Sequence, residues 1–80
     1  MLTIRYFAGA RAAAGGISSE DVDAATLNDL ISVLTGRHGE RLAVVLKAAS
    51  FLIDGLTSHD SDAALPAQAT VDVLPPFAGG

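Results

Sequence analysis

The chain of 80 residues has no cysteine and no tryptophan, and aromatic residues make up only 5% of it. Without cysteine there can be no disulfide, no thiolate metal site and no cysteine nucleophile. A chain of this length forms one domain, whose stability must come from a single modest core. The hydrophobic content of 50% is ample for that core.

Basic residues are also scarce, since 5 Lys and Arg stand against 9 Asp and Glu and give a net charge of −4. This balance argues against nucleic acid as a partner, because neutralising phosphates requires clustered Lys and Arg. No apolar run approaches the roughly 20 residues that span a bilayer, and the first residues do not resemble a signal peptide. We therefore expect a soluble, cytoplasmic protein that does not bind a membrane.

The residues that commonly bind metals do not form a recognisable site. His38 and His59 are the two histidines, and they lie far apart without a carboxylate at ligand spacing. Asp60 and Asp62 lie in a polar stretch that lacks the glycine and the terminal glutamate of a calcium loop. The sequence therefore predicts no metal site.

Alternating apolar residues predict the strands. Residues 2–7 place Leu2, Ile4 and Tyr6 on one face, with Phe7 on the other. Further strands are expected at 17–23, a polar edge strand, at 51–53, where Asp54-Gly55 starts a hairpin into Leu56-Thr57, and at 70–74. In the last strand Val71 and Val73 point inward, whereas Thr70, Asp72 and Leu74 point outward.

Helical spacing accounts for most of the remainder. The alanine-rich stretch 8–14 predicts a short helical turn that ends at Gly15-Gly16. Thr26 and Asp29 form a variant capping box at the start of the clearest helix, which we expect to end at Gly36. A shorter helix follows at 40–49. The order of elements predicts an α+β domain with a mixed sheet packed on one main helix.

The last strand is followed by Pro75-Pro76-Phe77-Ala78-Gly79-Gly80. The prolines favour an extended, semi-rigid stalk, and the glycines remove every β-carbon next to the terminal carboxylate. Six extended residues could project that carboxylate about 20 Å from the domain. We therefore divide the chain into a domain at 1–74 and an extended tail at 75–80, with Phe7, Leu74 and Phe77 forming an apolar patch at the root of the tail.

The two ends of the chain resemble a known family. Leu74-Pro75-Pro76-Phe77-Ala78-Gly79-Gly80, together with Leu2-Thr3-Ile4-Arg5-Tyr6-Phe7-Ala8, look like the small subunit of molybdopterin synthase, the MoaD branch of the MoaD/ThiS sulfur carriers. The resemblance covers nearly the whole chain and implies the ubiquitin-like β-grasp fold. Asp54-Gly55 departs from the family, in which a turn containing Asn is common.

The resemblance also implies a mechanism centred on Gly80. An adenylating partner would join the Gly80 carboxylate to AMP from ATP, and sulfur from a donor would then replace AMP to leave a thiocarboxylate. The large subunit would use that sulfur on a pterin precursor, in a heterotetramer with two copies of this chain. The chain would hold no permanent cofactor and no side-chain active site of its own.

Some positions of the chain match family contact positions. By this resemblance the partner-binding residues are Phe7, Arg11, Leu56, Leu74 and Phe77. Two alternatives stay open: the same chemistry for thiamine or cysteine synthesis, and a ubiquitin-like modifier or interaction module joined through Gly80 to lysines.

Overall fold

The computed structural model describes residues 1–58 and 60–76. His59 and the tail positions Phe77, Ala78, Gly79 and Gly80 lie outside the described residues. The elements within them are β1 (Leu2–Tyr6), α1 (Gly9–Ala13), β2 (Ser19–Val22), α2 (Leu27–His38), α3 (Glu40–Ala48), β3 (Ser50–Ile53), β4 (Leu56–Thr57) and β5 (Thr70–Leu74).

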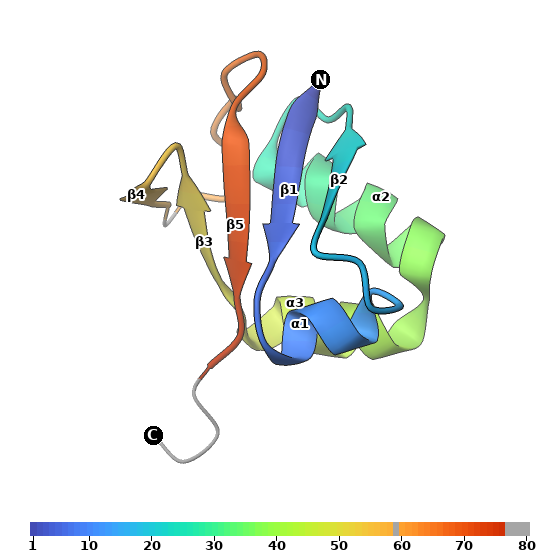
Figure 1. Ribbon diagram of the computed structural model, residues 1–80. Helices are drawn as coiled ribbons and strands as arrows, with labels where there is room; N and C mark the ends of the chain where they lie inside the picture. Colours follow the sequence, from blue (N-terminus) through green and yellow to red (C-terminus); the bar gives the residue numbers. More distant parts are fainter. Residues whose placement is uncertain (59, 77–80) are drawn as a thin grey trace.

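The strands form one mixed sheet in the order β2-β1-β5-β3-β4 (Figure 1). β1 and β5 pair in parallel, and the other neighbouring strands pair antiparallel. The last strand therefore lies at the centre of the sheet, between the first strand and β3. The polar strand β2 lies at an edge, as the sequence predicts.

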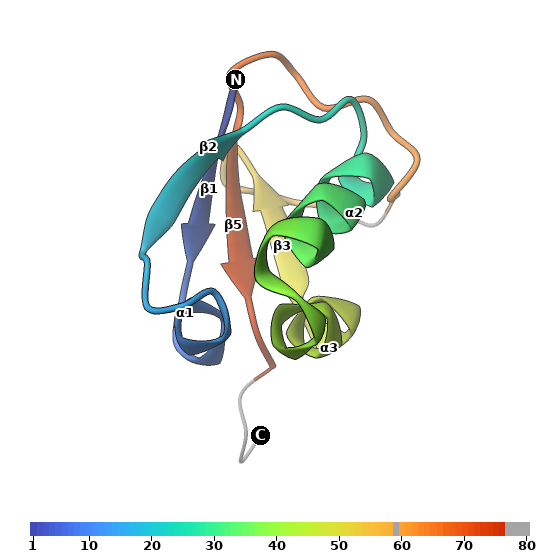
Figure 2. The same ribbon diagram turned by 90° about the vertical axis from the view of Figure 1, so that its right-hand side faces the viewer.

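One face of the sheet carries the core. α2 and α3 lie over this face, and α1 packs beside α3 at the end of the sheet where β5 finishes (Figure 2). Alternation in the strands directs one set of side chains to this face and leaves the other set on a face that no described helix covers. The largest fully buried side chains are Tyr6, Ile4, Leu30, Leu34, Leu42, Leu46, Val22, Val71 and Val73.

α2 begins as predicted, because the Thr26 hydroxyl accepts a hydrogen bond from the backbone N–H of Asp29 at 3.1 Å. The prediction that this helix ends at Gly36 is wrong. Gly36 keeps a helical conformation, and the helix continues to His38 before Gly39, at φ 86°, turns the chain into α3. Among the described helices, none combines the length and the apolar character needed to cross a bilayer.

The turn between β3 and β4 confirms the predicted hairpin. Asp54 and Gly55 both have positive φ, 50° and 86°, as a two-residue turn that follows the twist of the strands requires. Asp54 also joins the turn to β5, because its backbone N–H donates to the carbonyl of Thr70 and its carboxylate accepts from the N–H of Thr70, each at 2.8 Å. The turn thereby fixes the start of the central strand.

The cap of α2 gives a first prediction. Thr26→Ala removes the acceptor for one of the N–H groups of the first turn, and we expect a loss of about 1 kcal/mol of unfolding free energy. For a domain of this size the melting temperature should fall by roughly 4–8 °C. Ser32→Ala, at an exposed position inside the same helix, is the matched control and should not lower the melting temperature. Equal melting temperatures for Thr26→Ala and wild type would show that the cap does not stabilise the helix.

Candidate functional site

The root of the tail is placed by the central strand. β5 runs parallel to β1 as far as the pair Tyr6 and Val73, and Leu74 lies opposite Ser50 of β3. Pro75 is half-buried and Pro76 is exposed. The chain thus leaves the domain from the middle of the sheet, at the end beside α1 and α3 (Figure 1).

An apolar groove of about 430 Å³ surrounds this point. We call it the tail-root groove, and its lining residues are Phe7, Ala8, Gly9, Ser50, Leu74, Pro75 and Pro76. The backbone N–H of Phe7 donates to the carbonyl of Val73 at 3.3 Å, which holds the end of β1 against β5. Phe7 and Leu74 are each half-buried, so the structure brings together the two outward apolar residues that the sequence pairs.

The other positions matched to family contacts lie elsewhere. Arg11 is exposed on α1, the helix that starts at the groove. Leu56 is 75% exposed in the edge strand β4 and pairs with Ile53, which lies beside Val71. Because paired residues share a face, Leu56 lies on the helix side of the sheet, toward the end opposite the tail. The structure therefore does not join Leu56 to the tail-root groove.

The open face of the sheet holds an ion pair that sequence reasoning missed. Arg5 of β1 and Asp72 of β5 are direct neighbours in the parallel register. The guanidinium donates twice to the carboxylate, from Nε to Oδ1 at 2.5 Å and from Nη2 to Oδ2 at 2.8 Å. The Asp72 side chain is only 9% exposed, whereas that of Arg5 is 52% exposed. The expectation that Asp72 points outward is right, but Arg5 buries it.

This pair also reaches the groove. The Arg5 guanidinium carbon lies 5.6 Å from the centre of the Phe7 ring, a cation–π distance. Hydrogen bonding to Asp72 raises the pKa of Arg5 above its ordinary value, which is already high, so the guanidinium stays charged at any physiological pH. Opposite charges at outward positions of two strands were the available signal, but only the strand register could show that they meet.

A second polar cluster lies on the helix side and joins three elements. The Glu20 carboxylate of β2 accepts from the Tyr6 hydroxyl at 2.5 Å and from Nη1 of Arg37 at 2.9 Å, and it contacts Nε2 of His38 at 2.5 Å. The Tyr6 and His38 rings also meet edge to face at a centroid distance of 5.9 Å. These contacts tie the last turn of α2 to the sheet, which explains why the helix passes Gly36.

The cluster shifts two pKa values. Burial, followed by the hydrogen bond to Glu20, raises the pKa of the Tyr6 hydroxyl far above its ordinary value of 10.0. For Glu20, burial acts to raise the pKa, but hydrogen bonds from Tyr6, His38 and Arg37 outweigh it and lower the pKa below its ordinary value. Glu20 is therefore an ionised carboxylate with its acceptors occupied, which suits a structural role.

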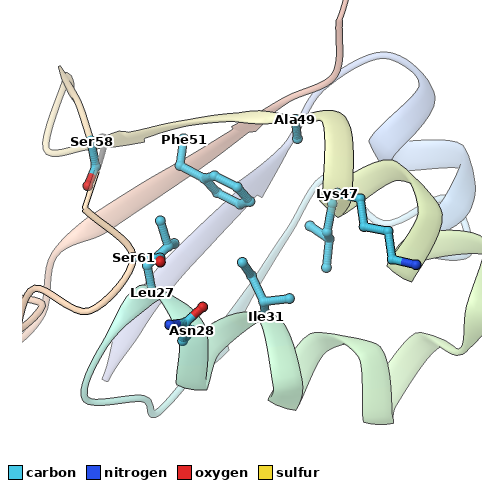
Figure 3. Close-up of a pocket in the computed structure, with 9 residues that line it drawn as sticks. Leu27, Asn28, Ile31, Lys47, Ala49, Phe51, Ser58 and Ser61 are labelled. Carbon is cyan, nitrogen blue, oxygen red and sulfur yellow. The ribbon is translucent and has the colours of Figure 1, made fainter.

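The described residues hold no cluster of side chains suited to bind a metal ion. Across residues 1–58 and 60–76, no three His, Cys, Asp or Glu side chains gather as metal ligands. A shallow pocket of about 310 Å³ lies between α2, the end of α3 and β3, where Phe51 and Ile31 project into the same space (Figure 3). Ser58, Ser61 and Lys47 are among its polar lining residues, and no hydrogen bond joins either serine side chain to a base among the described residues.

Comparison with known proteins identifies the fold and the family. Residues 4–80 match the model of the ThiS family, whereas no curated protein sequence matches the chain significantly. Among solved structures, the small archaeal modifier protein 1 of Methanosarcina acetivorans matches with a TM-score of 0.83 at 20% identity, over 99% of this chain and 95% of that chain.

Two complexes also contain similar chains. The BexX/CysO complex of Amycolatopsis orientalis matches with a TM-score of 0.80 at 21% identity, over 100% of both chains. The complex of subunits 1 and 2 of molybdopterin-converting factor from Helicobacter pylori matches with a TM-score of 0.75 at 19% identity, over 99% of this chain and 97% of that chain. These similarities confirm the predicted ubiquitin-like β-grasp fold.

The Glu20 cluster predicts a pH dependence of stability. Because folding lowers the Glu20 pKa, its stabilising effect is complete above the ordinary value of 4.5 and is lost as pH falls through the folded-state value. At pH 7 we expect Glu20→Gln to lower the melting temperature by at least about 5 °C, since hydrogen bonds to charged groups contribute about 1.5 kcal/mol or more. Near pH 3 the difference from wild type should shrink.

Thermal unfolding followed by circular dichroism across this pH range is the measurement. Asp21→Asn, an exposed position in the same strand, is the control and should change the melting temperature little at any pH. A difference between Glu20→Gln and wild type that stays constant from pH 7 to about pH 3 would contradict the assignment of an ionised, hydrogen-bonded Glu20.

Proposed function

The chain belongs to the ThiS family, within the MoaD/ThiS superfamily of ubiquitin-like sulfur carriers, and from this premise we propose that it carries sulfur as a thiocarboxylate on Gly80. The family match carries the proposal, because it runs from residue 4 to residue 80 and so includes the whole Gly-Gly tail. The domain supplies a rigid base, and the tail supplies the reacting atom.

The chemistry requires activation of the terminal carboxylate, because oxide is a poor leaving group. In an adenylating partner, a Gly80 carboxylate oxygen attacks the α-phosphorus of ATP and pyrophosphate leaves. A hydrosulfide equivalent then attacks the carbonyl carbon of the acyl-adenylate, AMP leaves, and the thiocarboxylate remains. The catalytic side chains for both steps belong to the partner, and ATP is its substrate. Such activation suits a cytoplasmic protein.

We assign the carried sulfur to molybdopterin synthesis. The residues that support this assignment are Leu74 to Gly80, whose Pro-Pro-x-x-Gly-Gly end resembles the MoaD branch. The similarity in fold to a chain of the Helicobacter pylori molybdopterin-converting factor complex is consistent with it. In this assignment the large subunit of the synthase receives the tail, and two copies of each subunit form a heterotetramer.

The tail-root groove is the surface on which these partners dock. It combines the half-buried side chains of Phe7 and Leu74 with the two prolines that begin the tail. A partner that covers the groove would grip the domain at the point from which the tail departs. The tail would then start in a fixed direction, which lowers the entropy lost when Gly80 reaches a buried site.

A second candidate is a protein modifier, favoured by the similarity in fold to the Methanosarcina acetivorans modifier protein. The same acyl-adenylate would then be attacked by a lysine amine instead of sulfur, giving an isopeptide bond. Intact mass spectrometry after incubation with ATP, a sulfur donor and the adenylating enzyme separates the two functions. Exchange of one oxygen for sulfur identifies a carrier, and a branched conjugate identifies a modifier.

We predict that thiocarboxylate formation depends strictly on the length of the tail. One residue added after Gly80, or deletion of Gly80, moves the reacting carboxylate by roughly 3.5 Å, which is far outside attack geometry, and thiocarboxylate formation should be lost. Gly79→Val should be nearly as damaging, because a β-branched side chain widens the tail and restricts its backbone. We expect little change in the melting temperature of any of the three variants. Wild-type thiocarboxylate yield without Gly80 would refute the carrier function.

We predict that substitutions in the tail-root groove weaken binding to the large subunit. Phe7→Asp or Leu74→Asp should weaken the affinity for the large subunit at least about tenfold, because a charge replaces a central apolar anchor. Folding should be largely retained, since both side chains lie outside the core. Val44→Asp, at a position of α3 that is 58% exposed, is the control and should bind like wild type. Calorimetric affinities equal to wild type for both groove variants would show that the partner docks elsewhere.

A further inference from the structure

The Arg5 and Asp72 pair adds a polar feature to the apolar docking surface. It lies on the face of the sheet that no described helix covers, and Arg5 is two residues before Phe7, which directly follows β1. The contact between the Arg5 guanidinium and the Phe7 ring makes this polar feature continuous with the tail-root groove. A partner seated on the groove would therefore meet Arg5 next.

Within residues 1–58 and 60–76, the Arg5 side chain makes hydrogen bonds to Asp72 alone, and its other N–H groups have no acceptor there. A guanidinium has five N–H groups, and Asp72 accepts from Nε and from one N–H of Nη2. Both N–H groups of Nη1 and the second N–H of Nη2 point away from this carboxylate, and the side chain as a whole is 52% exposed. The end formed by Nη1 and Nη2 presents two roughly parallel N–H groups, a geometry that suits two acceptor oxygens.

Asp72 also fixes the orientation of these donors. An arginine side chain normally loses considerable rotamer freedom when it is immobilised in an interface. Here the two hydrogen bonds to a carboxylate in the central strand, and the contact with Phe7, already hold the guanidinium in place. Apolar residues of similar volume often replace a buried ion pair without loss of stability. What the ion pair provides in addition is an oriented, half-exposed set of donors.

The charge of the pair indicates which acceptor these donors fit. The Asp72 carboxylate already neutralises Arg5, so the pair as a whole carries no net charge. Neutral acceptors could cover the remaining N–H groups without burying an unpaired charge. A carboxylate from the partner would instead place a second negative charge near Asp72 and leave the group of three with a net charge of −1. Main-chain carbonyl oxygens are therefore the better match.

We infer that Arg5 is an anchor for the adenylating partner, donating from Nη1 and Nη2 to main-chain carbonyl oxygens of a segment whose apolar side chain occupies the tail-root groove. A helix C-terminus or a loop end offers such carbonyls unpaired. This inference rests on the proposed sulfur-carrier function for the identity of the partner. It assigns to Arg5 and Asp72 a role in recognition beyond their contribution to the fold.

The test compares binding of Arg5 variants to the adenylating enzyme by calorimetry, at about 50 mM and about 300 mM salt. Arg5→Gln removes the charge and the planar donors, whereas Arg5→Lys keeps the charge and loses the two parallel N–H groups. We expect both variants to bind about tenfold more weakly than wild type, and Arg5→Lys, which keeps the pair neutral, to do so by the same factor at both salt concentrations. Arg41→Gln, an exposed arginine on α3, is the matched control and should bind within about twofold of wild type.

Three results would overturn the inference. Unchanged affinity of Arg5→Gln would limit the pair to an internal role. Wild-type affinity of Arg5→Lys would show that charge alone matters for binding. A loss of affinity that disappears at high salt would identify a carboxylate as the acceptor. Arg5→Lys serves as the test if Arg5→Gln proves unfolded. Thiocarboxylate formation by the wild-type chain is followed in the same samples, so a failure of the sulfur-carrier function is seen separately from a failure of Arg5 to anchor the partner.

Discussion

The parallel pairing of the first strand with the last is the interaction on which the rest of the structure depends. It joins residues almost at opposite ends of the chain, with Thr3 opposite Thr70 and Tyr6 opposite Val73. Three features of the candidate site follow from this register. It places Arg5 beside Asp72 and brings the C-terminal ends of both strands to the same end of the sheet. It also places Phe7 next to the point where the tail leaves the domain.

The two faces of the sheet carry different kinds of residues. The helix side holds the core and the Glu20 cluster, in which burial and closed hydrogen bonding serve stability. The open side carries an oriented guanidinium and an apolar groove, features common in binding surfaces and without a use in a core. A small domain can thus keep its recognition residues independent of its packing, because alternation along each strand separates the two sets.

Local patterns predicted much of this arrangement. Alternation identified the strands and placed Phe7 and Leu74 outward, and the Thr26 cap and the Asp54-Gly55 turn were recognisable because each depends on a few adjacent residues. Contacts between distant elements were not predictable. The contact between Arg5 and Asp72 depends on the register of two strands. The Glu20 cluster joins two strands to the end of α2, and the same contacts extend this helix beyond Gly36. Leu56, matched to a contact position by resemblance, lies in the edge strand β4, away from the tail-root groove, and its role as a contact stays a prediction.

The central position of β5 has a consequence for the order of folding. Until β5 inserts between β1 and β3, the sheet consists of two unconnected halves. The tail-root groove does not exist in that state, because Leu74 and the prolines form part of its wall. A partner that binds the groove can therefore engage only chains in which β5 has joined the sheet, so docking would select folded copies over unfolded ones.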